Sequence, residues 1–199
     1  MMLDDPYKEL RSTLSELRKN KVETRVGIVP ESVALLLEKL ELSTTAEDRN
    51  NLYFYLDAEL MRWGDIPLRV QFLQKFCQES PSDPLRHATL SHALAALFLE
   101  KNENTNFKKE ALDLGFKSLD SSVEENRFIR YCGSSLARLA ISLDEYDALN
   151  HALKYLVSPE AANCQEDIPH FECEYINDID VSRCDKELFY RYKVICGMV

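Results

Sequence analysis

The residues best suited to hold a metal ion lie near the C-terminal end of the chain. Cys164, His170, Cys173 and Cys184 fall within one acidic segment, and thiolate and imidazole groups are common ligands of zinc. Structural zinc sites usually combine two close pairs of ligands. Only His170 and Cys173 are closely spaced, and no second close pair exists. A metal site or an enzyme built on these residues is therefore kept as a minor alternative, and no metal or cofactor is predicted.

A nucleophilic residue on a strained, glycine-flanked turn is the second kind of chemistry to consider. Cys132-Gly133-Ser134-Ser135 is the one candidate of this kind in the sequence. It falls in the middle of a predicted helix with no strand before it, whereas a nucleophile elbow joins a strand to a helix. Small residues that let a neighbouring helix approach closely are the better interpretation of this stretch, so no catalytic residue is predicted.

The remaining polar residues lack the spacing that catalysis or metal binding requires. His87 and His92 lie five residues apart on one predicted helix, and therefore on different faces of it. His151 is isolated beside a predicted turn. Carboxylate pairs such as Glu172 and Glu174 have no basic partner at a fixed spacing, and the glycines form no phosphate-binding loop. These patterns predict a protein that is not an enzyme.

The charge of the chain indicates what kind of partner it could bind. The chain has 199 residues, a formal net charge of −10 and a pI near 5.0. A protein this acidic repels phosphate backbones, which argues against binding to nucleic acid. The same charge would steer a basic protein toward the surface. The length fits a single domain over residues 1–199.

The sequence also bears on location. The first eleven residues are polar and lack the apolar core of a signal peptide. No apolar run approaches the length of a membrane span, so no membrane association is predicted. The six cysteines are widely and irregularly spaced, as expected of reduced thiols. A cytoplasmic location is the resulting prediction.

The N-terminal part, residues 1–45, is expected to form a pair of helices. Asp5-Pro6 is a good helix start, and the apolar residues of the stretch from Tyr7 to Leu17 recur at spacings of three and four. That narrow stripe would dock on the rest of the fold or on another chain. Residues 21–30 alternate like a strand or form an extended connector, and a second amphipathic helix follows from Pro30 to Leu42.

Residues 46–159 are expected to form three consecutive helix hairpins. Thr45 with Asp48 predicts the start of the first, and Gly64 the end of its first helix. Asp83-Pro84 predicts the start of the second, with a loop over 101–106. The third is marked by two further signals. They are the capping-box spacing of Ser122 and Glu125, which starts it near Val123, and Ser158-Pro159, which closes it.

This regular succession of hairpins resembles tetratricopeptide-type repeats. Features in common are paired helices, the small residues Ala111 and Ser118 seven apart, and a proline after the second helix at Pro81 and Pro159. The units are longer than the family's 34 residues, and only Gly133 suggests the usual pattern of the first helix. The resemblance implies an all-α, right-handed array of antiparallel hairpins, an α-solenoid with an extended binding surface.

Residues 160–199 are expected to form an acidic C-terminal extension with a closing helix from about Asp185, preceded by an extended segment over His170–Ile176. We therefore favour a non-enzymatic protein that binds another, basic protein, in a narrower form an inhibitor or immunity-type protein. The alternative is an adaptor or regulatory subunit, whose Tyr7–Leu17 stripe pairs with a partner helix. The oligomeric state is left open. Six acidic residues are the candidate partner-binding residues: Glu166, Asp167, Glu172, Glu174, Asp178 and Asp180.

Overall fold

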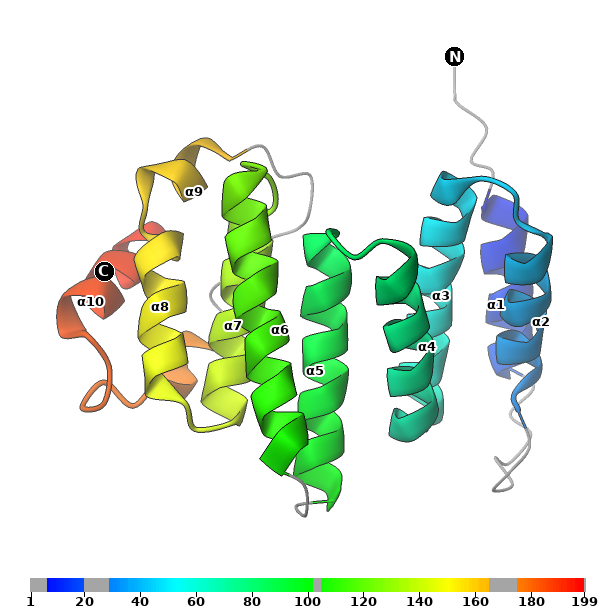
Figure 1. The fold of residues 1–199 in the computed structure, drawn as a ribbon, viewed down its shortest axis with the longest axis horizontal. Helices are drawn as coiled ribbons and strands as arrows, with labels where there is room; N and C mark the ends of the chain where they lie inside the picture. Colours follow the sequence, from blue (N-terminus) through cyan, green and yellow to red (C-terminus); the bar gives the residue numbers. More distant parts are fainter. Residues whose placement is uncertain (1–6, 20–28, 102–104, 165–174, 199) are drawn as a thin grey trace. The chain divides into compact units, whose positions relative to one another are not determined.

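The computed structural model of the chain describes residues 7–19, 29–101, 105–164 and 175–198 (Figure 1). All regular elements in these ranges are helices, which confirms the predicted all-α class. Among them, no helix is long and apolar enough to cross a membrane. The contacts within the chain divide it into two compact units, Met1–Arg69 (unit 1) and Val70–Val199 (unit 2). A single domain over the whole chain stays a prediction.

Unit 1 is formed by helices that pack around a leucine core. Leu14, Leu36, Leu56 and Leu60 are its largest fully buried side chains, and the stripe that the sequence places on the first helix contributes Leu14 to it. The second helix packs along the third and also touches the first. The helices described in this unit are α1 (Lys8–Lys19), α2 (Glu31–Leu42), α3 (Ala46–Trp63) and the start of α4 (Ile66–Glu79).

The ends of α3 follow from local backbone chemistry, as the sequence predicts. The Thr45 hydroxyl accepts a hydrogen bond from the Asp48 N–H at 3.1 Å, which satisfies one of the free donors at the start of the helix. Gly64 ends the helix with φ of 82°, a left-handed conformation that a side chain would strain. The predicted start and end of this helix are both confirmed.

Unit 2 consists of helices that pack on their neighbours in the sequence. The fifth and sixth helices make the most extensive contact, the sixth and seventh and the seventh and eighth also pack together, and the last helix packs on the eighth (Figure 1). The elements after α4 are α5 (Pro84–Lys101), α6 (Thr105–Glu124), α7 (Ile129–Ser142), α8 (Tyr146–Leu156), α9 (Pro159–Asn163), the 3-10 helix η1 (Ile176–Asp178) and α10 (Lys186–Ile195).

Two glycines in unit 2 mark places where helices pack too closely for a side chain. A Cβ at Gly133 of α7 would lie 2.9 Å from Leu156 Cδ2 of α8. A Cβ at Gly115 of α6 would lie 2.9 Å from Leu136 Cδ1 of α7. Both leucines are buried, so they cannot move aside without strain. The interpretation of the stretch around Gly133 as a close helix contact is therefore confirmed.

The third helix pair begins later than the sequence predicts. Ser122 and Glu125 have the capping-box spacing, but Ser122 is buried inside α6, where its hydroxyl donates to the Leu119 carbonyl at 2.7 Å. A serine that bonds back to its own helix in this way imitates a cap in the sequence. The first helix of the pair starts only after Phe128, whose φ is 59°. The predicted start near Val123 is wrong, because α7 begins at Ile129.

Two other boundaries also differ from the predictions. Lys101 ends α5 and Thr105 starts α6, so the helices extend into the predicted loop over 101–106. Ser158 ends the third pair as predicted, but it also caps α9 by accepting from the Ala161 N–H at 3.2 Å. The Asp5-Pro6 start, most of the strand-like segment over 21–30 and most of the extended segment over 170–176 lie outside the described residues.

Candidate functional site

The loop before α10 carries the two predicted partner-binding residues that the structure describes. Asp178 ends η1 and Asp180 follows it two residues later, and both side chains are exposed. The structure therefore leaves both carboxylates open to a partner. The other four predicted residues lie outside the described part of the chain: Glu166, Asp167, Glu172 and Glu174.

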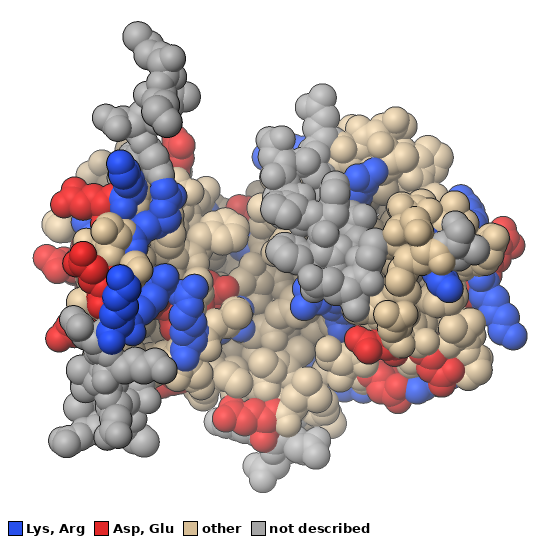
Figure 2. All heavy atoms as spheres, turned by 180° about the vertical axis from the view of Figure 1, so that it is seen from behind, with Lys and Arg blue, Asp and Glu red and all other residues tan. Residues whose placement is uncertain are grey.

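Further exposed carboxylates lie on the segments that adjoin this loop, and we refer to the group as the C-terminal acidic surface. They come from the turn between α7 and α8, from the first turn of α8 and from the start of α10. Figure 2 shows Asp and Glu side chains gathered at the lower end of unit 2. The members of the surface are Asp144, Asp147, Asp178, Asp180 and Asp185.

Hydrogen bonds to α8 fix the loop that carries this surface. The Asp180 N–H donates to the Tyr146 hydroxyl at 3.1 Å, and the Asp185 N–H donates to Asn150 Oδ1 at 2.8 Å. The Asp185 carboxylate accepts from two N–H groups of the first turn of α10 and so starts that helix, which confirms the predicted closing helix. The acidic residues are thus held by both neighbouring helices.

One arginine lies among these carboxylates. The Arg183 guanidinium donates to the Asp144 carboxylate and stacks 4.1 Å above the Tyr146 ring. That hydrogen bond lowers the pKa of Asp144, and hydrogen bonds from Ser182 lower the pKa of Asp180. Both carboxyls are therefore ionised at neutral pH. Arg183 forms its ion pair with Asp144, and Lys108 also acts on that carboxylate, so the negative charge of the surface rests mainly on the other four carboxylates.

A buried tyrosine pair anchors the whole segment beneath the acidic surface. The hydroxyls of Tyr175 and Tyr192 lie 2.8 Å apart, and the two rings stack with centroids 6.4 Å apart. Tyr192 is 0% exposed, and this burial raises the pKa of its hydroxyl. Ile176, Ile179 and Phe189 are buried beside them. The described part of the predicted acidic extension is therefore built into the core of unit 2.

The cysteines and histidine proposed for a zinc site are only partly described. His170 and Cys173 lie outside the described residues. Cys184 is buried, which raises the pKa of its thiol, and Cys164 faces the Asn126 carbonyl at 3.7 Å. In the described ranges, no three His, Cys, Asp or Glu side chains lie close enough together to hold a metal ion.

Two polar residues that are far apart in the sequence, His92 and Ser135, lie close together in the structure. His92 Nε2 of α5 lies 2.9 Å from Ser135 Oγ of α7 and 3.1 Å from the Ser135 carbonyl oxygen. The carbonyl oxygen only accepts, so its hydrogen bond with Nε2 forms in the tautomer that carries the proton on Nε2. In either tautomer the contact links α5 to α7. No sequence signal could have found it, because the two residues are far apart in the chain.

A second polar cluster lies at the start of α5. His87 is 2% exposed, and its Nδ1 has no hydrogen-bond partner. Desolvation lowers its pKa, Lys117 lowers it further, and Asp83 opposes the shift. Burial also raises the pKa of the nearby Cys77 thiol to about 11, so this cysteine stays protonated and unreactive at neutral pH.

The buried His87 predicts how the stability of unit 2 responds to acid. Its pKa in the folded state lies below the unfolded value of about 6.5, so the unfolded chain takes up the proton at a higher pH than the folded chain does. The free energy of unfolding should therefore fall between about pH 7 and pH 5, and it should fall less in His87→Gln. Urea unfolding at several pH values measures this, and parallel profiles for the two proteins would contradict it.

Comparison with known proteins finds no relative of this chain. A scan against protein-family models, a search of curated proteins and a search of solved structures each found no match to this chain.

Proposed function

We propose that this protein is a non-enzymatic binding protein whose C-terminal acidic surface engages a basic region of another protein. The observation that carries the proposal is the arrangement of that surface. Its carboxylates are exposed, two of them are held in the ionised form, and the loop that bears them is fixed to α8. A charged surface that is ordered before binding loses less entropy when a partner docks.

The electrostatics favour a basic partner. The protein carries a net charge of −10, and such a charge raises the association rate of an oppositely charged protein. The narrower proposal is an inhibitor or immunity-type protein that covers a basic toxin or nuclease. Its support is the compact size and the acidity of the chain.

Architecture and location belong to the same proposal. The successive packing of α5 to α8 supports a tetratricopeptide-like array of helix pairs, which would present an extended binding surface. The described cysteines are free thiols, which supports a reducing, cytoplasmic location. The adaptor alternative draws less support, because the Tyr7–Leu17 stripe places Leu10 and Leu14 inside unit 1.

Neutralising the acidic surface should remove the partner. In Asp147→Asn/Asp178→Asn/Asp180→Asn, three negative charges are lost while each side chain keeps an oxygen that accepts hydrogen bonds. The protein captured by the wild-type chain from a lysate of its source cells should be recovered at least about tenfold less by this variant. Raising the salt to about 0.5 M should release the partner from the wild-type chain, because the charges are exposed.

The matched control removes the same charge elsewhere in unit 2. Glu100→Gln/Glu110→Gln/Asp113→Asn alters three exposed acidic residues of α5 and α6, so its net charge equals that of the first variant. This control should capture the partner as the wild-type chain does. Equal losses in both variants would show that only net charge matters, and recovery of no protein at low and moderate salt would refute the proposal.

A further inference from the structure

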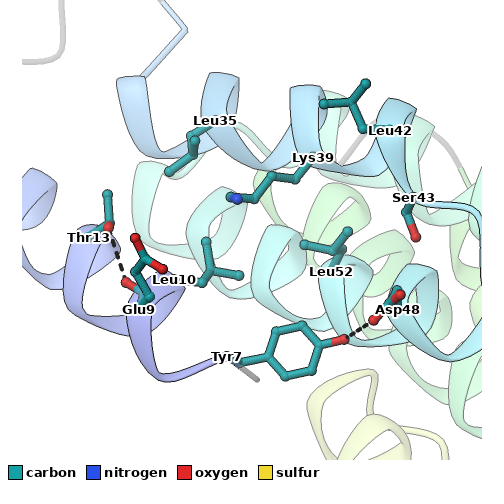
Figure 3. Close-up of a pocket in the computed structure, with 10 residues that line it drawn as sticks. All are labelled: Tyr7, Glu9, Leu10, Thr13, Leu35, Lys39, Leu42, Ser43, Asp48 and Leu52. Atoms are coloured by element: carbon teal, nitrogen blue, oxygen red, sulfur yellow. Dashed lines mark hydrogen bonds between the residues drawn. The ribbon is translucent and has the colours of Figure 1, made fainter. Parts of the chain in front are cut away.

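Unit 1 has an open groove between two of its helices, independent of the C-terminal acidic surface. It encloses about 470 Å³, with α1 and α2 as its walls and α3 as its floor (Figure 3). Leucines from all three helices share its lining with polar side chains, and Leu42 at its edge is 73% exposed. The residues that line it are Tyr7, Glu9, Leu10, Thr13, Leu35, Lys39, Leu42, Ser43, Asp48 and Leu52.

A hydrogen-bond network closes one end of the groove and fixes its width there. The Tyr7 hydroxyl donates to Asp48 Oδ1 at 2.6 Å (Figure 3), and the Thr45 hydroxyl donates to Asp48 Oδ2 at 2.8 Å. Asn51 Nδ2 donates to the Tyr7 hydroxyl at 3.2 Å. These bonds tie the start of α1 to the start of α3, so the groove is formed before any partner arrives.

Four exposed carboxylates lie on the two helices that form the walls of the groove, and one of them, Glu9, lines it. Glu9 and Glu16 lie seven residues apart and therefore on one edge of α1, and Glu31 and Glu38 lie likewise on one edge of α2. All four are exposed, and none forms an ion pair with another residue in the described part of the chain. Against them, Lys39 is the one cation among the described residues that line the groove.

The basic residues of α1 lie in a sector of their own on that helix. Lys8, Arg11 and Lys19 span about 80° of the circumference of the helix, and the sector of Glu9 and Glu16 follows next to it, because Lys19 lies three residues after Glu16. Figure 2 shows Lys and Arg side chains gathered on one face of unit 1. The charges of α1 are thus sorted into a basic side and an acidic edge, and the groove adjoins the acidic edge.

We infer that this groove binds a basic amphipathic helix of a partner protein. Apolar residues of that helix, spaced three and four apart, would enter between the leucines of the groove, while its Lys and Arg residues would face the four glutamates. The charge of the rims selects a basic occupant, and the exposed Leu42 gives the apolar residues a contact. The lining runs from Tyr7 to Thr13 on one wall and from Leu35 to Leu42 on the other, so the bound helix would contact the groove over about two turns.

Other occupants fit the groove less well. An acidic helix would be repelled by the four glutamates, and among the described residues that line the groove only Lys39 would attract it. A second copy of this chain could offer the basic side of its own α1, but the apolar stripe of that helix contributes Leu10 and Leu14 to its own unit and is not free to enter a groove. A basic helix from another protein satisfies both the charge and the apolar surface.

Binding of a synthetic helix to the full-length protein tests this inference. The probe is a fluorescein-labelled peptide of about 14 residues, with leucines at helical spacing and lysines elsewhere. A scrambled peptide of the same composition and an amphipathic peptide with glutamates in place of the lysines serve as comparisons. Fluorescence anisotropy at about 0.15 M salt gives each Kd. The basic amphipathic peptide should bind at least about tenfold more tightly than either comparison.

Variants assign the binding to the groove. Glu9→Gln/Glu16→Gln/Glu31→Gln/Glu38→Gln should weaken binding of the basic peptide at least about tenfold, and Leu35→Ser/Leu42→Ser should weaken it by a similar factor. The matched apolar control is Leu99→Ser, an exposed leucine of unit 2, and it should bind as the wild-type chain does. Circular dichroism confirms that each variant is folded.

Several outcomes would overturn the inference. They are equal binding of the scrambled peptide, tighter binding of the acidic peptide, unchanged binding in both groove variants, or a concentration-dependent dimer that the groove variants abolish. The Asp147→Asn/Asp178→Asn/Asp180→Asn variant separates this site from the proposed function, because it alters unit 2 alone. It should leave binding of the helical peptide unchanged even where it removes the partner of the acidic surface.

Discussion

Replacing Tyr192 by alanine is expected to lower the free energy of unfolding of unit 2 by about 3–5 kcal/mol, the usual cost of removing a buried aromatic ring. Tyr192 is 0% exposed, and its hydroxyl is bonded to that of Tyr175. The substitution leaves a cavity and also leaves the Tyr175 hydroxyl without this partner. Urea unfolding followed by circular dichroism measures the loss.

The same substitution should also affect the C-terminal acidic surface. The loop with Asp178 and Asp180 lies between the two tyrosines in the chain, so the loss of their contact should release it. Amide hydrogen exchange over residues 175–198 should then speed up more than exchange in α5. Capture of a partner by the acidic surface should fall in parallel.

A matched control is available two residues away. Tyr190 lies on the same helix but is 57% exposed, so Tyr190→Ala should change the free energy of unfolding by no more than about 0.5 kcal/mol. Tyr192→Phe should lower the free energy of unfolding by about 1 kcal/mol, between the effects of the other two substitutions, because it keeps the ring and loses only the hydrogen bond. Equal effects of Tyr192→Ala and Tyr190→Ala would show that the segment does not depend on this anchor.

Helix boundaries fixed by local chemistry could be predicted from the sequence. Thr45, Gly64 and Asp185 act through hydrogen bonds or backbone conformations within a few residues, and the structure confirms each of them. The turn between α6 and α7 could not be predicted in the same way. Asn126 and Phe128 adopt positive φ there, and although asparagine tolerates this conformation, it is rare for a phenylalanine, so the residue type gives no signal for it.

The candidate site, too, could be predicted from the sequence only in part. Composition and charge predict that the C-terminal segment is acidic, and the structure places Asp178 and Asp180 on an exposed loop. The sequence could not show that this loop is fixed to Tyr146 and Asn150 of α8, because those contacts join residues more than thirty positions apart. The groove of unit 1 was missed for the same reason, since its rims come from two separate helices.

The second large effect is expected at Leu14, and it bears on the adaptor alternative. Leu14 is 0% exposed in the core of unit 1, so Leu14→Ala should lower the free energy of unfolding by about 2–5 kcal/mol. Leu42 is the matched control, because it is 73% exposed and Leu42→Ala should change stability by no more than about 0.5 kcal/mol. Thermal and urea unfolding of the two variants measure the difference.

This comparison decides between two roles for the Tyr7–Leu17 stripe. If the stripe were a free surface for a partner helix, Leu14→Ala would reduce partner binding and leave stability unchanged, as an exposed leucine would. The structure predicts instead that Leu14→Ala lowers stability. Helix α1 is held to α3 by the Arg18 hydrogen bonds to the buried Glu59 carboxylate as well as by its leucines. Loss of stability in Leu14→Ala would mean that α1 is part of the fold, and that the Tyr7–Leu17 stripe is not a free surface for a partner helix.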